Sequence, residues 1–497
     1  MRVKKQAAFT TMSSCSPRLS HLPPELVLEI VPYLALQDAL ALLATCSSFF
    51  ALTADRTLWI SLLTQTRFSN TIACPPFADL SHPSYTLPRL KAIAYKYLRR
   101  EQRWSQPIIR HRTPVLTGRF EQNERPEIIY SIQGTDILLL HLQTSGQLVC
   151  WNKRTATQYS LPGISTEAFK IVDISAPCDS DGVSSIALIA RFWGLPYTRF
   201  AHVVTIHHTD GVPTAFSGTC TVVSTVRGFF DTIFVSEDYF GCAVLSIPSD
   251  TMICTISPLR PADGPLQLTE PHEVRVPQEV DDLDMTLCFV HRGHLYSLTE
   301  SNDARVVHIQ HFSRNNVKAR RLQECRRWTC AILPQEVDPE PMARPFCFML
   351  PSIPIYGVAG VFIRYFGHDA PDAFVTLAFL PCTVAPDAEE DQSPLDFDAP
   401  CSLVRIPGHP SHDASLVWMD HSGFNVAMVL EAEVDNPQLK LIRYHPLALG
   451  DTKISVHDME VPPSINLLAL TTVCIDDTAG TIHLVDNFSV LTTLYYV

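Results

Sequence analysis

Apolar residues follow two different periods along this chain of 497 residues. Between residues 22 and 104 they recur every three or four positions, which is the period of a helix. From Thr113 onward they alternate with polar residues, which is the period of a strand. The pattern therefore predicts an α+β protein of several domains, with a small helical region at the N-terminus and a large all-β region after it.

The first predicted helix lies in the segment LPPELVLEIVPYL, residues 22–34. Proline is favoured in the first turn of a helix, where its missing amide has no partner to lose, and Glu25 suits the positive end of the helix dipole. Pro32 is expected to end or kink the helix, because proline removes an amide donor and clashes with the preceding turn. The helix is apolar on nearly every side, so another surface must cover it.

Two more helices are predicted, one over residues 39–53 with Asp38 as its N-cap, and one over residues 56–63 after Asp55. Three helices of this size cannot bury so many Leu, Phe and Trp side chains among themselves, because units below about 40–50 residues usually need a partner or a staple to fold. The surplus apolar surface is therefore expected to dock on another protein.

This segment resembles an F-box, and it aligns with the family pattern over residues 21–62 without a gap. The matching positions are Leu22, Pro23, Glu25, Leu26, Leu28, Ile30, Leu34, Asp38, Leu40, Cys46, Leu52, Asp55, Leu58 and Trp59. Two departures are Phe49, at a position that is often Trp, and Pro32, in the last turn of the docking helix. The alternative interpretation is a small buried helical hairpin.

The resemblance implies a partner and a division of roles. F-boxes bind the adaptor subunit of cullin–RING (SCF-type) ubiquitin ligases and, through it, the cullin scaffold. By resemblance, the adaptor would contact Leu22, Pro23, Leu26, Val27 and Ile30. The residues that would pack the helices together are Leu34, Leu40, Cys46, Phe49 and Trp59.

A further helix is predicted over residues 87–104. Its apolar stripe contains Leu87, Leu90, Ile93, Ala94, Tyr97 and Trp104. Its other face carries Arg89, Lys91, Lys96, Arg99, Arg100 and Arg103. Such a face suits either phosphate contacts or a solvated helical linker, and we favour the linker.

The β region repeats a hairpin pattern that predicts a propeller. The hairpins lie at residues 136–152, 185–208, 239–257, 285–300, 374–408, 424–445 and 471–487. Their starts are mostly 45–55 residues apart, and one gap of 89 residues has room for the strands expected in 346–366. A repeated four-stranded unit of about 40–50 residues is typical of propeller blades. We expect about seven blades, with six or eight as alternatives, closed by the terminal strand at residues 489–497.

Two tripeptides, CWN at 150–152 and LVD at 484–486, resemble the WD dipeptide of WD-repeat propellers. The other hairpins lack it. A leucine-rich solenoid is the alternative for this half, but LxxLxL repeats are absent from the sequence. The expected division is a disordered tail at 1–20, the F-box at 21–63, a helical linker at 64–112 and the propeller-like domain at 113–497, with an acidic loop at 386–400.

Charge separates the same two halves. Residues 1–112 hold 14 Lys/Arg and 6 Asp/Glu, whereas residues 113–497 hold 24 and 45, so the β region carries a net charge of −21. An acidic body repels phosphate backbones, which makes nucleic acid an unsuitable partner.

The fifteen cysteines contain no CxxC spacing, and we expect them to be reduced. The N-terminus has no apolar signal segment, and the longest uncharged apolar stretch, Ala39–Ala54, is shorter than the roughly 18–20 residues of a membrane span. These features predict a protein of the cytoplasm or the nucleus that does not enter membranes.

No catalytic, metal-binding or cofactor motif is present in the sequence: GxGxxG, GxxxxGK[ST], GxSxG and HExxH are all missing. His207 and His208 are candidate metal ligands, but polar residues at strand ends more often form turns. We therefore expect a binding protein: a ligase substrate receptor, or alternatively a non-degradative scaffold that uses the adaptor for assembly. A propeller hydrolase is a third class, for which the sequence shows no acid–base cluster.

Overall fold

The structure of the protein is a computed structural model. It describes residues 22–68, 80–112, 115–120, 124–160, 169–175, 177–180, 182–192, 198–209, 212–225, 227–246, 251–259, 272–276, 286–291, 293–300, 306–319, 325–331, 346–349, 359–366, 374–384, 395–396, 402–407, 416–422, 426–432, 437–446 and 452–496. The chain divides into two compact units. The helical unit comprises residues 1–66 and 80–98, and the β unit comprises residues 67–79 and 99–497.

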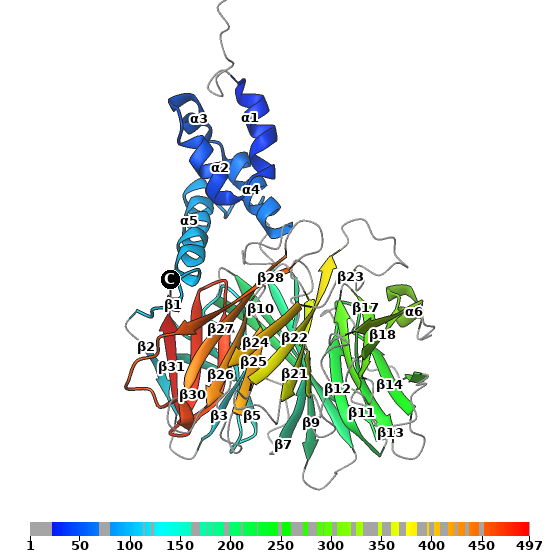
Figure 1. Ribbon diagram of the computed structural model, residues 1–497. Helices are drawn as coiled ribbons and strands as arrows, with labels where there is room; N and C mark the ends of the chain where they lie inside the picture. Colours follow the sequence, from blue (N-terminus) through cyan, green and yellow to red (C-terminus); the bar gives the residue numbers. More distant parts are fainter. Residues whose placement is uncertain are drawn as a thin grey trace, which may run out of the picture. The chain divides into compact units, whose positions relative to one another are not determined.

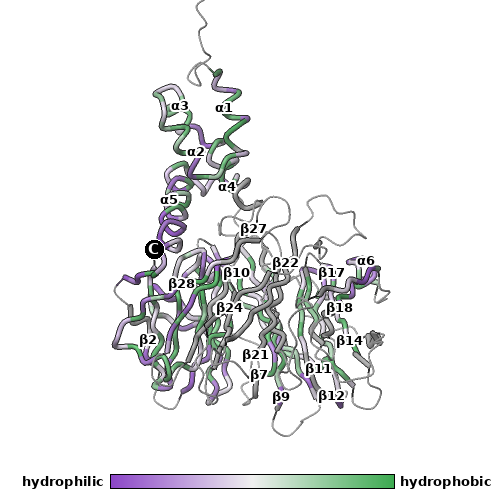
Figure 2. Tube along the Cα trace, viewed as in Figure 1, coloured by the Kyte–Doolittle hydropathy of each residue, from purple (hydrophilic) through white to green (hydrophobic). Residues whose placement is uncertain are grey.

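The helical unit is built from short helices around one apolar core. The helices are α1 (Pro24–Ile30), the 3₁₀ turn η2 (Val31–Tyr33), α2 (Leu36–Leu43), α3 (Ser47–Leu52), α4 (Arg56–Phe68) and the first part of α5 (Leu87–Trp104). Hydrophobic residues run along α1 in Figure 2. The buried core contains Val27, Val31, Leu36, Ala39, Leu43, Phe49, Leu58, Trp59, Leu62, Leu63, Leu80, Leu90 and Ala94.

The segment predicted as one helix over residues 39–53 forms two helices, so that prediction is corrected. The break lies at residues 44–46, where Thr45 Oγ1 donates a hydrogen bond of 2.7 Å to the carbonyl of Leu42. Cys46 then takes an extended backbone, with φ −151° and ψ 161°. Hydroxyl side chains that bond to the nearby backbone compete with the helix, which explains why the helix stops here.

The first two helices, α1 and α2, begin without a side-chain cap hydrogen bond. As predicted, Pro32 ends the first helix: α1 stops at Ile30 and Pro32 lies in η2. The N-cap of α2 is Ala35, without a side-chain cap bond. Asp38 is therefore not the N-cap that we expected, but an acidic residue in the first turn, where it still favours the helix dipole.

The turn before α5 is held by one side chain. Arg56 Nη2 donates to the carbonyls of Leu80, Ser81 and His82 at 3.2, 2.8 and 2.8 Å, and its Nε donates to the carbonyl of Tyr85 at 3.0 Å. A guanidinium offers five donors in a fixed plane, so it can satisfy several carbonyls of one turn. This contact joins α4 to the start of α5 within the helical unit.

The described strands of the β unit form seven sheets, numbered here in chain order, in which all pairs are antiparallel except that of β1 with β28 (Figure 1). Sheet 1 contains β3 (Pro126–Ser131), β4 (Ile137–Leu142), β5 (Gln147–Asn152) and β6 (Thr157–Ser160). Sheet 2 contains β7 (Phe169–Ile174), β8 (Cys178–Ser180), β9 (Val183–Phe192), β10 (Arg199–Thr209) and β11 (Val212–Ser224). Sheet 3 contains β12 (Gly228–Val235), β13 (Tyr239–Ser246), β14 (Thr251–Pro258) and β15 (His272–Val276).

The other four sheets complete the unit. Sheet 4 contains β16 (Thr286–His291), β17 (His294–Glu300), β18 (Val306–Phe312) and β19 (Arg326–Ala331), with α6 (Arg314–Lys318) before β19. Sheet 5 contains β20 (Phe346–Met349), β21 (Ala359–Phe366), β22 (Phe374–Val384), β23 (Leu395–Asp396) and β24 (Ser402–Pro407). Sheet 6 contains β25 (Leu416–Ser422), β26 (Val426–Ala432), β27 (Gln438–Pro446), β28 (Thr452–Met459) and β1 (Ile108–Ile109). Sheet 7 contains β29 (Leu470–Asp476), β30 (Thr481–Asp486), β31 (Val490–Tyr495) and β2 (Val115–Arg119).

Each of the seven predicted hairpins contributes strands to a different sheet. The strands expected in 346–366 do not build a sheet of their own: β20 pairs with β21 and β21 pairs with β22, so they complete sheet 5. In the acidic segment 386–400 the structure describes only Leu395–Asp396, which pair with β22 as β23. The predicted tail at 1–20 lies outside the described residues.

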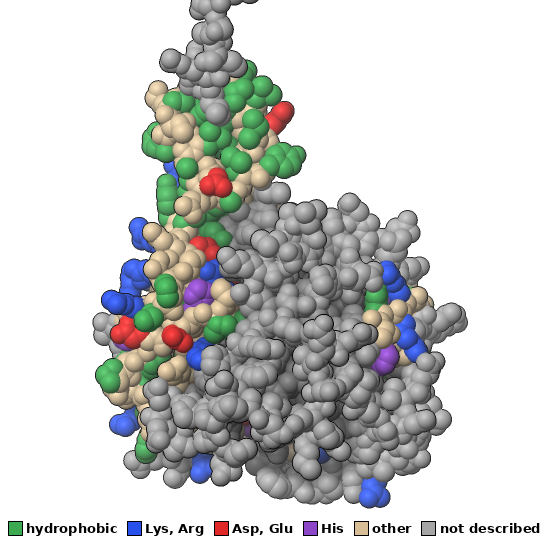
Figure 3. Space-filling view, viewed as in Figure 1, with side chains coloured by type: hydrophobic (Ala, Val, Ile, Leu, Met, Phe, Trp, Pro, Cys, Tyr) green, Lys and Arg blue, Asp and Glu red, His purple; other side chains and the backbone are tan. Residues whose placement is uncertain are grey.

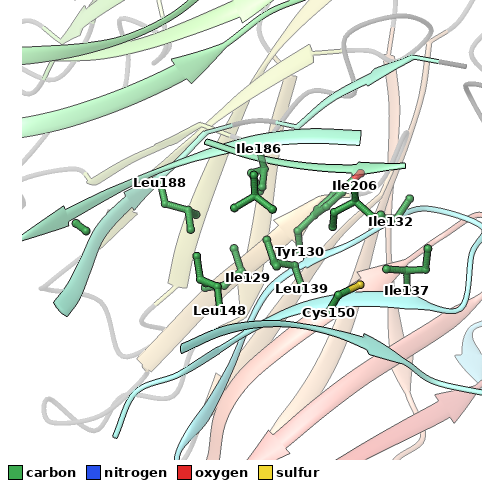
Figure 4. Close-up of a cluster of buried hydrophobic side chains, with 12 residues drawn as sticks. Ile129, Tyr130, Ile132, Ile137, Leu139, Leu148, Cys150, Ile186, Leu188 and Ile206 are labelled. Carbon is green, nitrogen blue, oxygen red and sulfur yellow. The ribbon is translucent and has the colours of Figure 1, made fainter. Parts of the chain in front are cut away.

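Successive sheets pack face to face through apolar clusters. One cluster joins sheets 1 and 2, where Ile129, Leu139 and Cys150 meet Ile186 and Leu188 (Figure 4). Similar clusters join sheets 2 and 3, 3 and 4, 7 and 1, and 6 and 7. β24 of sheet 5 lies beside β28 of sheet 6. The β unit is therefore a series of antiparallel sheets that resembles a propeller domain.

Residues from both ends of the β region share sheet 7. The terminal strand β31 pairs with β30 on one side and with β2 on the other. Leu491, Leu494 and Tyr496 are fully buried beside these pairings. The predicted strand at residues 489–497 is confirmed, and it links the last hairpin of the chain to the first strand of the β region.

The end of α5 belongs to the β unit, although we predicted a solvated linker face there. Trp104 is 1% exposed and packs in the cluster of sheets 6 and 7, and β1 pairs in parallel with β28. Arg100 is only 5% exposed and donates to the carbonyl of Asp477 at 2.5 Å. Arg100 is thus a buried structural residue, because its donors satisfy a buried carbonyl that no water would reach.

A buried ion pair fixes the same segment. Arg443 Nη2 lies 2.5 Å from Glu101 Oε2, and Arg100 Nη2 lies 2.9 Å from Glu101 Oε1. Burial by itself would raise the pKa of Glu101, but the two guanidinium groups outweigh it and hold this pKa below its usual value. Glu101 is therefore charged at neutral pH and bridges the two arginines.

Candidate functional site

The first candidate site is the outer face of α1. Leu26 and Ile30 are 43% and 42% exposed, Pro23 is exposed and Leu22 is partly exposed. Residues four positions apart lie on one face of a helix, so Leu26 and Ile30 form a continuous apolar strip. Four of the five residues predicted to contact the adaptor therefore lie at the surface of the helical unit.

Val27 lies on the inner side of α1. Its side chain is 1% exposed, and Val31, one turn later, is fully buried. These two residues face the core because they lie about 100° around the helix from Leu26 and Ile30. Val27 thus packs in the core of the helical unit, and its contact with the adaptor stays a prediction.

Two exposed aromatic side chains were missed by the sequence interpretation. Tyr33 is 85% exposed in η2, and Phe50 is 64% exposed on α3, which packs against α1. In Figure 3 hydrophobic side chains cover much of the visible surface of the helical unit. A signal was present in the sequence: Phe49 and Phe50 are adjacent and lie about 100° apart around a helix, so one ring can face outward while the other is buried.

The predicted packing residues fall into two groups. Phe49 and Trp59 are buried at 1% and 0% exposure, as predicted, whereas Leu34, Leu40 and Cys46 are only partly buried. Trp59 Nε1 donates to the carbonyl of Thr53 at 2.9 Å, which ties α4 to the end of α3. The indole therefore packs and also satisfies its single donor.

The Cys46 thiol lies next to a serine. Its Sγ is 3.1 Å from Ser48 Oγ, and this hydrogen bond lowers the pKa of the thiol below its usual value, with the Phe49 amide adding to the effect. Among the described residues the free cysteines are Cys46, Cys150, Cys178, Cys220, Cys242, Cys254, Cys288, Cys325 and Cys474.

The histidines of β10 do not form a reactive centre. His208 is 9% exposed and its Nε2 lies 3.5 Å from Ser184 Oγ, while its neighbour His207 points to the other face of the strand. Burial lowers the pKa of His208, and His207 adds to the shift. Within the ranges that the structure describes, no group of three or more His, Cys, Asp or Glu residues is placed to hold a metal ion.

A buried polar network joins sheets 1 and 7. Lys153 Nζ lies 3.6 Å from Asp476 Oδ2 and 3.2 Å from His483 Nε2, and His483 Nδ1 lies 2.9 Å from Thr493 Oγ1. Burial, together with the charge of Lys153, holds the pKa of His483 well below its usual value. A neutral imidazole can accept from Lys153 and donate to Thr493, so every member has a partner. The network is enclosed between the two sheets.

Two other buried titratable groups of the β unit, His202 and Cys150, are also neutral at physiological pH. Burial, with a contribution from His141, lowers the pKa of His202 to about 4, and burial raises the pKa of the Cys150 thiol to about 12. Neutral, buried groups of this kind behave as core residues.

The two WD-like positions form turns. Asn152 Oδ1 accepts hydrogen bonds from the amides of Arg154 and Thr155 at 3.0 and 3.1 Å. Asp486 Oδ1 accepts two, both at 2.9 Å, from amides two and four residues ahead. Each side chain therefore shapes the connection after its strand, β5 or β30.

No helix among the described residues is long and apolar enough to cross a membrane.

Comparisons with known proteins give one family match and several distant structural similarities. Residues 19–65 match the family described as F-box-like. Among solved structures, the chain is similar to the WD40 domain of SCAP from fission yeast, with 12% identity and a TM-score of 0.35 over 73% of this chain and 82% of that chain. It is also similar to a prolyl endopeptidase, with 10% identity and a TM-score of 0.34, where the match covers 82% of this chain but only 51% of that one. No curated protein matches the chain. The helical unit of this protein therefore carries an F-box-like motif, at residues 19–65.

Proposed function

We propose that this protein is the substrate-recognition subunit of an SCF-type cullin–RING ubiquitin ligase. The observation that carries the proposal is the strip formed by Leu26 and Ile30, which stays more than 40% exposed although it lies within the F-box-like motif. Catalysis then resides in other subunits. The helical unit binds the adaptor, and the β unit holds a target protein. The lysines of the target then stay close to the enzyme that carries activated ubiquitin.

The seven sheets support a seven-bladed arrangement for the β unit. In this proposal the β unit begins before the expected boundary at residue 113, because Trp104 and β1 already pack within it. The free cysteines support a reducing compartment, the cytoplasm or the nucleus.

The role of the strip formed by Leu26 and Ile30 can be tested directly in a binding assay with purified adaptor. We expect Leu26→Ala together with Ile30→Ala to weaken adaptor binding by roughly a thousandfold, because each side chain contributes about 2–3 kcal/mol at a packed contact. The matched control is Leu468→Ala, which removes a side chain of the β unit that is 51% exposed and should leave adaptor binding unchanged. Unchanged binding by the double variant would refute the proposal.

The alternative is a scaffold that binds the adaptor without ubiquitination. A pull-down with wild-type protein distinguishes the two: recovery of adaptor and cullin together supports the ligase subunit, and recovery of adaptor without cullin supports the scaffold.

A further inference from the structure

Strand β11 differs from the other edge strands of the β unit. It spans Val212–Ser224, thirteen residues, and pairs with β10 along almost all of that length. Among the described residues it pairs with β10 alone, so it forms one edge of sheet 2. The backbone N–H and C=O groups along such an edge are a template for a further strand.

The edge strands at the same position in other sheets are shorter or charged. β15 carries Glu273 and Arg275, β19 carries Arg326 and Arg327, and the edge strand β6 has only four residues. β11, with the sequence VPTAFSGTCTVVS, contains no Asp, Glu, Lys or Arg. Charges and shortness are two of the means by which proteins protect an edge from pairing, and β11 lacks both. Pro213 and the two register shifts lie near the ends of the strand, so the regular edge runs from Ala215 to Val222.

Packing on its two faces holds β11 in place. The ring of Phe216 lies 5.7 Å from that of Tyr159 in sheet 1, and Val223 is 2% exposed within the cluster of sheets 2 and 3. Val212 and Val222 are nevertheless 51% and 43% exposed. The strand therefore combines a fixed backbone with uncovered β-branched side chains, which lowers the entropic cost of adding a partner strand.

We propose that β11 is the target-binding edge of the β unit, where an extended, uncharged or basic segment of another protein adds as a further strand. This inference rests on the proposed function, which identifies the partner as a target of the ligase. In such strand addition the backbone hydrogen bonds provide affinity, and alternate side chains provide specificity. β-branched residues at alternating positions of the target segment suit the neighbouring Val212 and Val222.

Charge decides between a target segment and a second copy of this chain. Residues 113–497 carry a net charge of −21, so two copies repel each other, whereas a basic segment is attracted. The uncharged edge itself adds no local repulsion to an approaching strand. The occupant is therefore a segment of another protein.

The test uses the full chain and a defined probe, the synthetic peptide Lys-Thr-Val-Thr-Val-Thr-Val-Thr-Lys. We expect the peptide to bind and to slow amide hydrogen exchange in residues 212–224. Ser217→Lys together with Val222→Lys places charges at two exposed positions of the edge and should weaken peptide binding by at least roughly tenfold. The matched control, Thr157→Lys together with Gln158→Lys, adds the same charge at exposed positions of β6 and should change binding by less than about twofold.

A second peptide tests the backbone directly. Methylation of alternate amide nitrogens along one edge of the probe removes its strand-pairing donors and should weaken binding by at least roughly tenfold. The proposal is overturned if the unmodified peptide does not bind, or if the methylated peptide or the β11 lysine variant binds equally well. A dimer in sedimentation experiments that the β11 lysines dissociate would overturn it in favour of self-pairing. Adaptor binding by the β11 lysine variant is measured separately. A loss of adaptor binding would count against the proposed function, not against strand addition at β11.

Discussion

The helical unit and the β unit bury their apolar residues to different extents. Leu26 and Ile30 are more than 40% exposed on α1, whereas β4 and β13 are buried along their entire length. A sheet in the middle of a series has a neighbour on each face, so the apolar residues of central strands such as β4 and β13 are covered within the chain. A unit of a few short helices has too few neighbours, and its outer strip stays open for a partner. We therefore propose binding at an exposed apolar strip in the helical unit and at a backbone edge in the β unit.

The largest effect should come from deleting residues 489–497. This removes β31, unpairs β2 and β30, and uncovers the partners of Leu491, Leu494 and Tyr496. Exposed strand edges beside apolar surface aggregate, so we expect insoluble protein in expression trials. Deletion of residues 1–20 is the control and should leave solubility unchanged. Soluble protein without residues 489–497 that melts cooperatively would show that the β unit does not need this strand.

The start of the β unit can be located with two fragments. A fragment of residues 113–497 lacks Trp104 and Ile109, which are buried in the cluster of sheets 6 and 7, and should be less stable than a fragment of residues 99–497. Loss of a buried Trp costs about 3–5 kcal/mol, which denaturant unfolding would detect. Equal stability of the two fragments would place Trp104 outside the cooperative core of the β unit.

Substitutions at two neighbouring residues of α1 should affect different properties, one the stability of the protein and the other adaptor binding. Val27→Ala removes a side chain that is 1% exposed, so it should lower the stability of the protein by about 1–2 kcal/mol. Leu26→Ala should leave thermal stability nearly unchanged but weaken adaptor binding by roughly thirtyfold, equivalent to about 2 kcal/mol. The reverse pattern in melting and binding assays would mean that the two faces of α1 are assigned the wrong way round.

The smallest effect concerns pH. The pKa of Glu101 is lowered in the folded β unit by Arg100 and Arg443, so its contribution to stability is present above the unfolded pKa and is lost as the pH falls through the folded pKa. Glu101→Gln should therefore lower stability at pH 7 and reduce the dependence of stability on pH in the acid range below about pH 4.3. Glu460→Gln, at an exposed position, is the control and should leave the pH profile of unfolding unchanged.

Much of the candidate site could be predicted from the sequence. The helical period placed Leu26 and Ile30 on one face, and proline fixed the end of α1 at Ile30. Val27 could not be assigned in the same way, because in a helix that is apolar on nearly every side the period does not show which face meets the core. The exposed ring of Phe50 had the same ambiguity, since either of two adjacent aromatic residues could have been the buried one.

The sequence by itself determined the local elements of this protein: helices before about residue 104, hairpins after residue 113, and the F-box-like motif with the apolar strip of Leu26 and Ile30. Only the tertiary structure decided how these elements associate. It joined β20 and β21 to β22, paired β2 with β31, and buried Arg100 against the carbonyl of Asp477. The physical reason is that a period of two residues fixes which face of a strand is apolar but not which strand lies beside it. That choice depends on contacts between residues hundreds of positions apart, which no local pattern records.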